Sequence, residues 1–310
     1  MSERFSGGAI LENYETKNRV EYPKRVETEY FERVDKILAE IAKEQNDFLR
    51  GFGELKRDII NPDCSINMRS FMTKGGEGIY QKDDIKKDEE FIREKEEWWS
   101  GGDDETDEDK KRFYLAEWTE DKKRSSGILF EKVITIILHK MLRKEFFVSR
   151  ASKFDDYANG VDTIIINKET GGIICAFDEV TGDDVETKEN KVIEKDEKGG
   201  ASIKYGITFE KNNTGEIELI KKEIKNVPTF YLGLPKSDLR RIANKMAYNT
   251  EEKSEAEIEI CKRMVMSLKE QLANMLNDLN IYGSVKENLK NSNEFILRMQ
   301  GLIHEEAGYN

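Results

Sequence analysis

The sequence predicts an α/β (α+β) protein, in which helices surround a core of β-strands. Short apolar runs at 161–166, 173–180 and 229–234 have the length expected of buried strands. Helical segments flank these runs, because apolar residues recur at every third or fourth position in 24–50 and 125–142. Hydrophobic residues make up only 37% of the 310 residues and charged residues another 37%, which favours a modest core among long solvated helices.

We expect three segments along the chain. Residues 1–120 form a helical N-terminal region with an acidic linker, residues 121–235 form the α/β core, and residues 236–310 form a C-terminal helical hairpin. The linker is the run SGGDDETDED at 100–109, whose glycines and like charges favour a solvated loop. A nucleic-acid mimic or a regulatory tail is the alternative interpretation of this acidic run.

Apolar periodicity and turn residues assign the elements in chain order. The turn at 168–172 joins two strands as a hairpin, and the run NNTG at 212–215 joins two more. The expected elements are helices at 24–50, 83–97 and 125–142, strands at 146–149, 161–166 and 173–180, a polar helix at 183–198, strands at 201–210, 216–222 and 229–234, and helices at 258–279 and 285–302.

The C-terminal segment carries a heptad-like pattern. Between Ile258 and Leu279 the apolar residues are spaced alternately by three and four positions. We interpret this seam as one side of an antiparallel helical hairpin. A dimerising coiled coil, which would make the protein a homodimer through these helices, is the alternative.

Residue usage limits the chemistry that is available. Only two histidines occur, and the three cysteines are widely separated, which disfavours a zinc site, a Ser-His-Asp triad and a disulfide framework. A bound metal is therefore expected to be a hard, oxygen-ligated ion such as Mg²⁺ or Mn²⁺. The chain has no apolar run of membrane-spanning length and no apolar signal region, so we expect a cytoplasmic protein that does not bind membranes.

Charge is unevenly distributed along a chain whose net charge is −12. Residues 83–120 hold 16 acidic and 7 basic side chains, whereas residues 121–154 hold 9 basic and 3 acidic ones. A basic run of this kind permits a local phosphate-binding face on an acidic protein.

Three tryptophans, Trp98, Trp99 and Trp118, flank the acidic linker. We interpret them as anchors that hold the N-terminal region on the core, because tryptophan contributes mostly as buried area. Stacking on nucleic-acid bases is the alternative.

Acidic residues lie at both ends of the hairpin 161–180. Asp155, Asp156 and Asp162 precede or open its first strand, and Asp178 and Glu179 end its second. Pairing of the two strands would bring Asp162 and Asp178 to the same edge of the sheet, close enough to share a cation. The alternative is that these acids are ordinary strand-end and turn residues.

This order of elements resembles the PD-(D/E)xK, or restriction-endonuclease-like, nuclease superfamily over roughly 125–234. The resemblance implies a mixed sheet flanked by helices. It also assigns three acidic positions: Asp162 in GVDTIII opens the second core strand, Asp178 or Glu179 in CAFDEV ends the third, and Glu131 in GILFEKVI assists from the preceding helix.

The chain departs from this family at the lysine two positions beyond the second acid. Val180 and Thr181 stand where that lysine is expected. The resemblance implies a lysine displaced to a neighbouring element, and we rank Lys191 and Lys204 above Lys188.

The leading hypothesis is a nuclease that hydrolyses phosphodiester bonds, in DNA rather than RNA. Asp162 with Asp178 or Glu179 would hold Mg²⁺ (or Mn²⁺), and the ion would activate a water molecule. The alternative is a non-catalytic interaction or scaffold protein that keeps the nuclease fold without the lysine.

Overall fold

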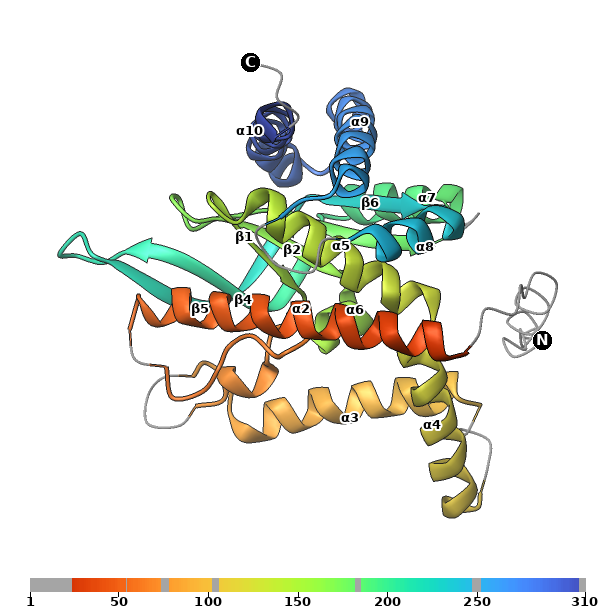
Figure 1. Cartoon of the computed structure of the whole chain (residues 1–310). Coiled ribbons are helices and arrows are strands. Elements are labelled where there is room, and N and C mark those ends of the chain that lie inside the picture. The colour runs from red at the N-terminus through yellow and green to blue at the C-terminus, as the bar shows by residue number, and fades with distance from the viewer. Residues whose placement is uncertain are drawn as a thin grey trace.

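The computed structural model describes residues 24–53, 55–73, 78–101, 106–181, 185–246 and 252–306. In these residues a mixed β-sheet lies at the centre and helices pack around it, which confirms the predicted fold class (Figure 1). The elements are α2 (Lys24–Arg50), the 3₁₀ helix η1 (Met68–Phe71), α3 (Lys82–Trp99), α4 (Glu108–Lys123), α5 (Ser126–Leu142), β1 (Phe146–Arg150), α6 (Lys153–Asn159), β2 (Thr163–Asn167), β3 (Ile173–Thr181), α7 (Val185–Glu197), β4 (Ala201–Lys211), β5 (Ile217–Val227), β6 (Thr229–Leu234), α8 (Lys236–Lys245), α9 (Glu255–Asn277) and α10 (Gly283–Glu306).

The sheet has the strand order β1-β2-β3-β6. The first three strands are antiparallel neighbours, in which Arg150 pairs with Thr163 and Thr163 pairs with Phe177. Strand β6 is parallel to β3, so the chain must cross from one end of the sheet to the other between them. Helix α7 and the separate hairpin β4–β5 form this crossover.

Helix α5 forms the buried layer against the sheet. Its N-terminus is capped by Ser125, whose Oγ accepts a hydrogen bond from the backbone N–H of Ile128 (3.3 Å). From Leu129 to Leu142 almost every side chain is buried, because the helix packs on β1 and β3 on one side and on α2 on the other. Its sequence is therefore apolar around most of the helix circumference.

Helix α6 contains Asp155 and Asp156, in a stretch to which the sequence assigned no helix or strand. Ser152 caps it by accepting a hydrogen bond from the N–H of Asp155 (3.1 Å), and Gly160 ends it in the left-handed region at φ 59°. The buried carboxylate of Asp155 accepts hydrogen bonds from the backbone N–H groups of Lys204 (2.7 Å) and Tyr205 (3.1 Å). Asp155 thus joins α6 to β4 and has a structural role.

The N-terminal helices form the lower part of the molecule in Figure 1, where α3 lies beneath α2 and α4 projects away from the body. Of the expected linker at 100–109, residues 102–105 lie outside the described residues, and Glu108 already begins α4. Asp107 caps this helix by accepting hydrogen bonds from the N–H groups of Asp109 and Lys110. Capping by the aspartate explains why an acidic run begins a helix here.

Helices α9 and α10 form the predicted helical hairpin. They are antiparallel, since Lys253 before α9 pairs with Glu306 at the end of α10, and the Lys269 ammonium donates to Gln300 (2.5 Å). Most of the predicted seam is buried between these helices and the core. Leu279 is the exception: α9 ends at Asn277, and the Leu279 side chain is 92% exposed.

No helix in the described part of the chain is both long enough and apolar enough to cross a membrane. The buried apolar side chains form one cluster, to which α2, α5, the sheet and the C-terminal hairpin all contribute.

The carboxyl group of Asp196 connects α7 to β6. It is fully buried and accepts hydrogen bonds from the backbone N–H of Thr229 (3.2 Å to each oxygen). Burial raises the pKa of Asp196 to about 8. The folded protein therefore holds a proton that the unfolded chain releases near pH 4, so this group makes the fold less stable as the pH rises through 8.

We predict that Asp196→Asn raises the melting temperature at pH 9 and has a smaller effect at pH 5. The amide imitates the protonated acid, and the buried Thr229 hydroxyl, which has no hydrogen-bond partner, can accept from its NH₂ group. A difference of one pKa unit corresponds to about 1.4 kcal/mol, so the free energy of unfolding at high pH should increase by a few kcal/mol. Calorimetry at both pH values measures this, with Glu197→Gln as the control. Equal gains at the two pH values would contradict the prediction.

Candidate functional site

Asp162 and Asp178 lie at the same edge of the sheet. The ladder between β2 and β3 pairs Thr163 with Phe177, and the Asp162 N–H continues it by donating to the Phe177 carbonyl (2.9 Å). In addition, the backbone N–H of Glu179 donates to Asp162 Oδ2 (2.6 Å). The geometry thus brings together the three acids that the sequence places at the ends of the two strands.

The two acids of β3 have different surroundings. Successive side chains of a strand point to opposite faces, so Asp178 and Glu179 diverge. Asp178 is buried and forms an ion pair with the Lys188 ammonium of α7. Glu179 is buried on the face where Glu131 and Arg150 influence its carboxylate. The Thr163 hydroxyl is the polar side-chain neighbour of the Glu179 carboxylate, but no hydrogen bond of normal geometry joins the two.

Two lysines of α7 border Asp178. Lys188 and Lys195 are seven residues apart, which places them on one face of the helix. The Lys195 ammonium donates to the Gly160 carbonyl (2.7 Å). A Cβ atom added to Gly160 would lie 3.3 Å from Lys195 Nζ and 3.8 Å from Asp178 Oδ2. The absence of a side chain at Gly160 therefore leaves space for both groups.

Glu131 on α5 takes part in a partly buried ionic group. Arg150, the last residue of β1, pairs with Glu131 and also with Asp63 Oδ2 (3.3 Å). The Arg150 Nε atom is buried without a hydrogen-bond partner. Arg150 therefore offsets part of the negative charge on this face of the sheet and holds Glu131 in place.

Negative charge is crowded at this edge. Burial raises the pKa of Asp162 well above its usual value, and the neighbouring Glu131 and Asp156 raise it further. Burial and Glu131 likewise raise the pKa of Glu179, and burial and Glu131 raise that of Asp156 to about 6. The cluster needs protons or a bound cation for full neutralisation at neutral pH.

Among the described residues, no three His, Cys, Asp or Glu side chains are arranged so that they could hold a metal ion together. The site therefore offers no closed metal cage. Mg²⁺ often binds to only one or two carboxylates and keeps several water molecules. Asp162 together with either Asp178 or Glu179, which point to opposite faces of β3, would offer such an ion two carboxylate ligands.

The three candidate lysines have different positions. Lys188, which we ranked last from the sequence, is the one that contacts Asp178. Lys191 is exposed on α7. The Lys204 ammonium pairs with Asp88 Oδ2 (2.5 Å) and lies over the ring of Phe154 (4.8 Å). The position two residues beyond Asp178 is filled by the buried Val180.

Sequence reasoning did not select Arg150 and Lys195 as parts of this site, and it selected Asp156 only as a member of an acidic cluster. A charged residue that ends an apolar strand is a signal that could have pointed to Arg150. For Lys195 the only signal is its spacing of seven residues from Lys188, which is informative only once the face of α7 is known.

Most charges of the basic run 121–154 are engaged inside the fold. Lys132 pairs with Asp35 (2.6 Å) and the fully buried Lys140 pairs with Glu257 (2.7 Å). Arg150 is held by its acidic partners as described. The phosphate-binding face expected from this run therefore has fewer free charges than its composition suggests.

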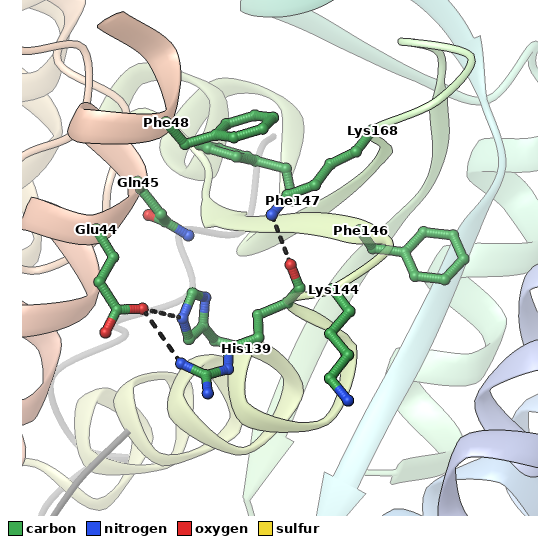
Figure 2. A pocket seen from close by; sticks show the side chains of 9 residues that line it. Glu44, Gln45, Phe48, His139, Lys144, Phe146, Phe147 and Lys168 are labelled. Carbon is green, nitrogen blue, oxygen red and sulfur yellow. Dashed lines mark hydrogen bonds and ion pairs between the residues drawn. The ribbon is translucent and has the colours of Figure 1, made fainter. Parts of the chain in front are cut away.

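A pocket lies at the end of the sheet opposite to these acids (Figure 2). Its volume is about 300 Å³, and α2, the end of α5 and the start of β1 line it. Glu44 contacts His139 (3.2 Å) and Arg143 (3.7 Å), and the Lys168 ammonium donates to the Arg143 carbonyl (2.5 Å). These contacts join α2 to α5, so we interpret the polar groups of this pocket as structural.

Comparison with known proteins provides no guide to the site. No protein family, curated protein or solved structure matches the chain. The site is therefore interpreted from its own geometry and chemistry.

We predict that Glu179→Gln raises the melting temperature in buffer that contains a chelator at pH 7.5. Burial and the neighbouring Glu131 disfavour the charged form of Glu179, and the substitution removes this cost at almost constant shape. An increase of about 1–2 kcal/mol in the free energy of unfolding raises the melting temperature of a chain of this size by several degrees. The control is Glu169→Gln in the exposed turn between β2 and β3, which should change little. A lower melting temperature for Glu179→Gln would contradict the prediction.

Proposed function

We propose that this protein is a divalent-metal-dependent nuclease that hydrolyses phosphodiester bonds, with DNA as its preferred substrate. The observation that carries the proposal is the position of Asp162 at the sheet edge. Its carboxylate accepts a hydrogen bond from the Glu179 N–H of β3, next to the ion pair between Asp178 and Lys188. Two carboxylates at neighbouring strands would hold a metal ion that activates water, and an ammonium group beside them would stabilise developing negative charge.

The arrangement of elements supports the same proposal. A helix that carries Glu131 precedes three antiparallel strands, and a further helix leads to a strand parallel to the third. This is the order that the resemblance to the PD-(D/E)xK superfamily implies. Asp162 stands immediately before β2, and Asp178 and Glu179 stand in the second half of β3, which supports the roles that the resemblance implies for them.

Each residue of the site would have a separate role in the reaction. Asp162, with Asp178 or Glu179, would hold Mg²⁺ or Mn²⁺, which when bound lowers the pKa of a coordinated water molecule and stabilises charge on the phosphate. Glu131 would orient water or a metal-bound group while Arg150 fixes its position. The ammonium group of Lys188 would stabilise negative charge that develops on the scissile phosphate.

In this proposal, Lys188 replaces the lysine that the resemblance implies at position 180, where the chain has Val180. It lies ten residues beyond Asp178, on α7 rather than on β3, yet its ammonium reaches the same carboxylate. The Asp178 ion pair more than offsets burial and raises the pKa of Lys188, so the group carries its charge at neutral pH. A substrate phosphate would compete with Asp178 for this cation.

We predict that the purified protein cleaves DNA in the presence of Mg²⁺ or Mn²⁺ and that Asp162→Asn abolishes this activity. Plasmid, single-stranded DNA and RNA should be incubated with each ion and with a chelator. The asparagine variant keeps the shape of the side chain and removes the charge that would hold the ion, so a loss of at least 100-fold is expected. The absence of cleavage of all three substrates, or cleavage unchanged in Asp162→Asn, would contradict the proposal.

We predict that Lys188→Gln lowers the rate of cleavage by about 10- to 1,000-fold, as removal of a charge-stabilising group typically does. Lys191→Gln is the matched control, since it removes the same charge from the same helix at an exposed position. Equal rates for the two variants would show that Lys188 has no part in the reaction.

A non-catalytic scaffold is the second candidate function. It is favoured by the absence, in the described part of the chain, of a three-ligand metal group, and by the direct pairing of Lys188 with Asp178. The cleavage experiment separates the two candidates, because a scaffold cleaves none of the substrates under any of the metal conditions.

A further inference from the structure

A row of aromatic rings lies on α3, α4 and α6. The ring centroids of Trp98 and Trp99 are 6.5 Å apart, those of Trp99 and Trp118 are 6.1 Å apart, and Tyr157 lies 4.7 Å from Trp99. We call these four residues the aromatic row. None of its tryptophans belongs to the hydrophobic core.

The outer end of the aromatic row is open to solvent. The side chain of Trp98 is 58% exposed and that of Trp99 is 37% exposed. Two further aromatic residues of α4, Phe113 and Tyr114, are also exposed. The expected anchoring role therefore accounts for Trp99 and Trp118, which pack against one another, but it does not account for Trp98.

Cations are interleaved with the rings. Lys122 Nζ lies 5.1 Å from the centroid of Trp99, 5.0 Å from Trp118 and 4.4 Å from Tyr157. At the exposed end, Lys95 Nζ lies 5.7 Å from the centroid of Trp98. Rings that alternate with ammonium groups suit a ligand that itself alternates flat bases with phosphates.

The aromatic row borders the acidic site. Tyr157 follows Asp156 directly in α6, the short helix that leads to Asp162. The Lys122 ammonium, which donates to the Tyr157 hydroxyl (2.8 Å), also interacts electrostatically with Asp156 and Glu131. A strand whose phosphate contacted a metal ion held by Asp162 would therefore extend towards Tyr157 and the tryptophans.

We propose that the aromatic row binds single-stranded nucleic acid by stacking its unpaired bases. This inference rests on the proposed function for the identity of the ligand, and it names the strandedness of the substrate. Base faces are hidden inside a duplex and accessible in a single strand, so the row selects unpaired substrate. Duplex DNA would have to fray before it reached the metal-binding acids.

A protein partner fits the surface less well. The exposed large apolar side chains of α3 and α4 are aromatic without exception, and the residues between them are mostly Lys, Glu and Asp. Aromatic residues are enriched in protein interfaces as well, but the centres of such interfaces are depleted of Lys, Glu and Asp. A second copy of this chain is the competing occupant, and the oligomeric state tests it.

The experiment measures binding without cleavage. A labelled 20-nucleotide single-stranded DNA, the corresponding RNA and the blunt DNA duplex are titrated with protein in chelator-containing buffer of low salt, with fluorescence anisotropy as the signal. We expect single strands to bind at least tenfold more tightly than the duplex. The comparison of DNA with RNA shows whether the 2′-hydroxyl affects binding.

Variants assign the binding to the aromatic row. Trp98→Ala should weaken single-strand binding about tenfold, which corresponds to the loss of one stacked base. Trp98→Phe should restore most of it. The control is Tyr282→Ala, which removes a 52% exposed ring from the turn before α10. Because Trp98 is exposed, Trp98→Ala should keep the circular dichroism and melting temperature of the parent chain.

Three results would overturn the inference: equal affinity for duplex and single strands, unchanged binding by Trp98→Ala, or a homodimer that Trp98→Ala dissociates. Its failure is distinguishable from failure of the proposed function. Metal-dependent cleavage of duplex and single strands at equal rates would support the proposed nuclease activity. It would contradict the proposal that the aromatic row selects single strands. Tight single-strand binding that depends on Trp98, without any cleavage, would support the role of the aromatic row and contradict the nuclease activity.

Discussion

The structure depends on the crowding of carboxylates at one edge of its central sheet. Pairing of β2 with β3 brings Asp162 next to Asp178 and Glu179, and the partly buried Glu131 of α5 interacts with the same acids. Such an arrangement is unfavourable in isolation, because like charges in a low-dielectric region repel strongly. Burial and mutual repulsion raise the pKa of both Asp162 and Glu179. Proteins keep unfavourable groups of this kind mainly where function needs them.

The elements around this edge supply the compensating charges from two sides. Strand β1 ends in Arg150, which pairs with Glu131, and α7 provides Lys188, which pairs with Asp178. The backbone contributes as well, through the Glu179 N–H that holds Asp162. The compensation is incomplete, and the remaining negative charge is what a divalent cation would neutralise. The same crossover helix therefore connects the parallel strands and completes the candidate site.

The central elements could be predicted from the sequence because their signals are local. The apolar runs at 161–166 and 173–180 and the turn between them determine the hairpin, and the hairpin alone places Asp162 near Asp178. The side of α7 that faces the sheet is set by tertiary packing, so the sequence could not rank Lys188 above Lys191 and Lys204. Helix α6 was missed because its seven residues are too few for a clear period; only the cap at Ser152 and the turn at Gly160 mark it. Arg150 was missed because its acidic partners are distant in sequence.

The central claim is that the carboxylate edge binds a divalent metal ion, and electron paramagnetic resonance of Mn²⁺ tests it most directly. Titration of the metal-free protein with Mn²⁺ should show at least one ion bound per chain at micromolar to low-millimolar concentration. Excess Mg²⁺ should displace it, and the double variant Asp162→Asn, Asp178→Asn should not bind it. Binding that persists undiminished in the double variant, or no binding by the parent chain in this range, would contradict the account.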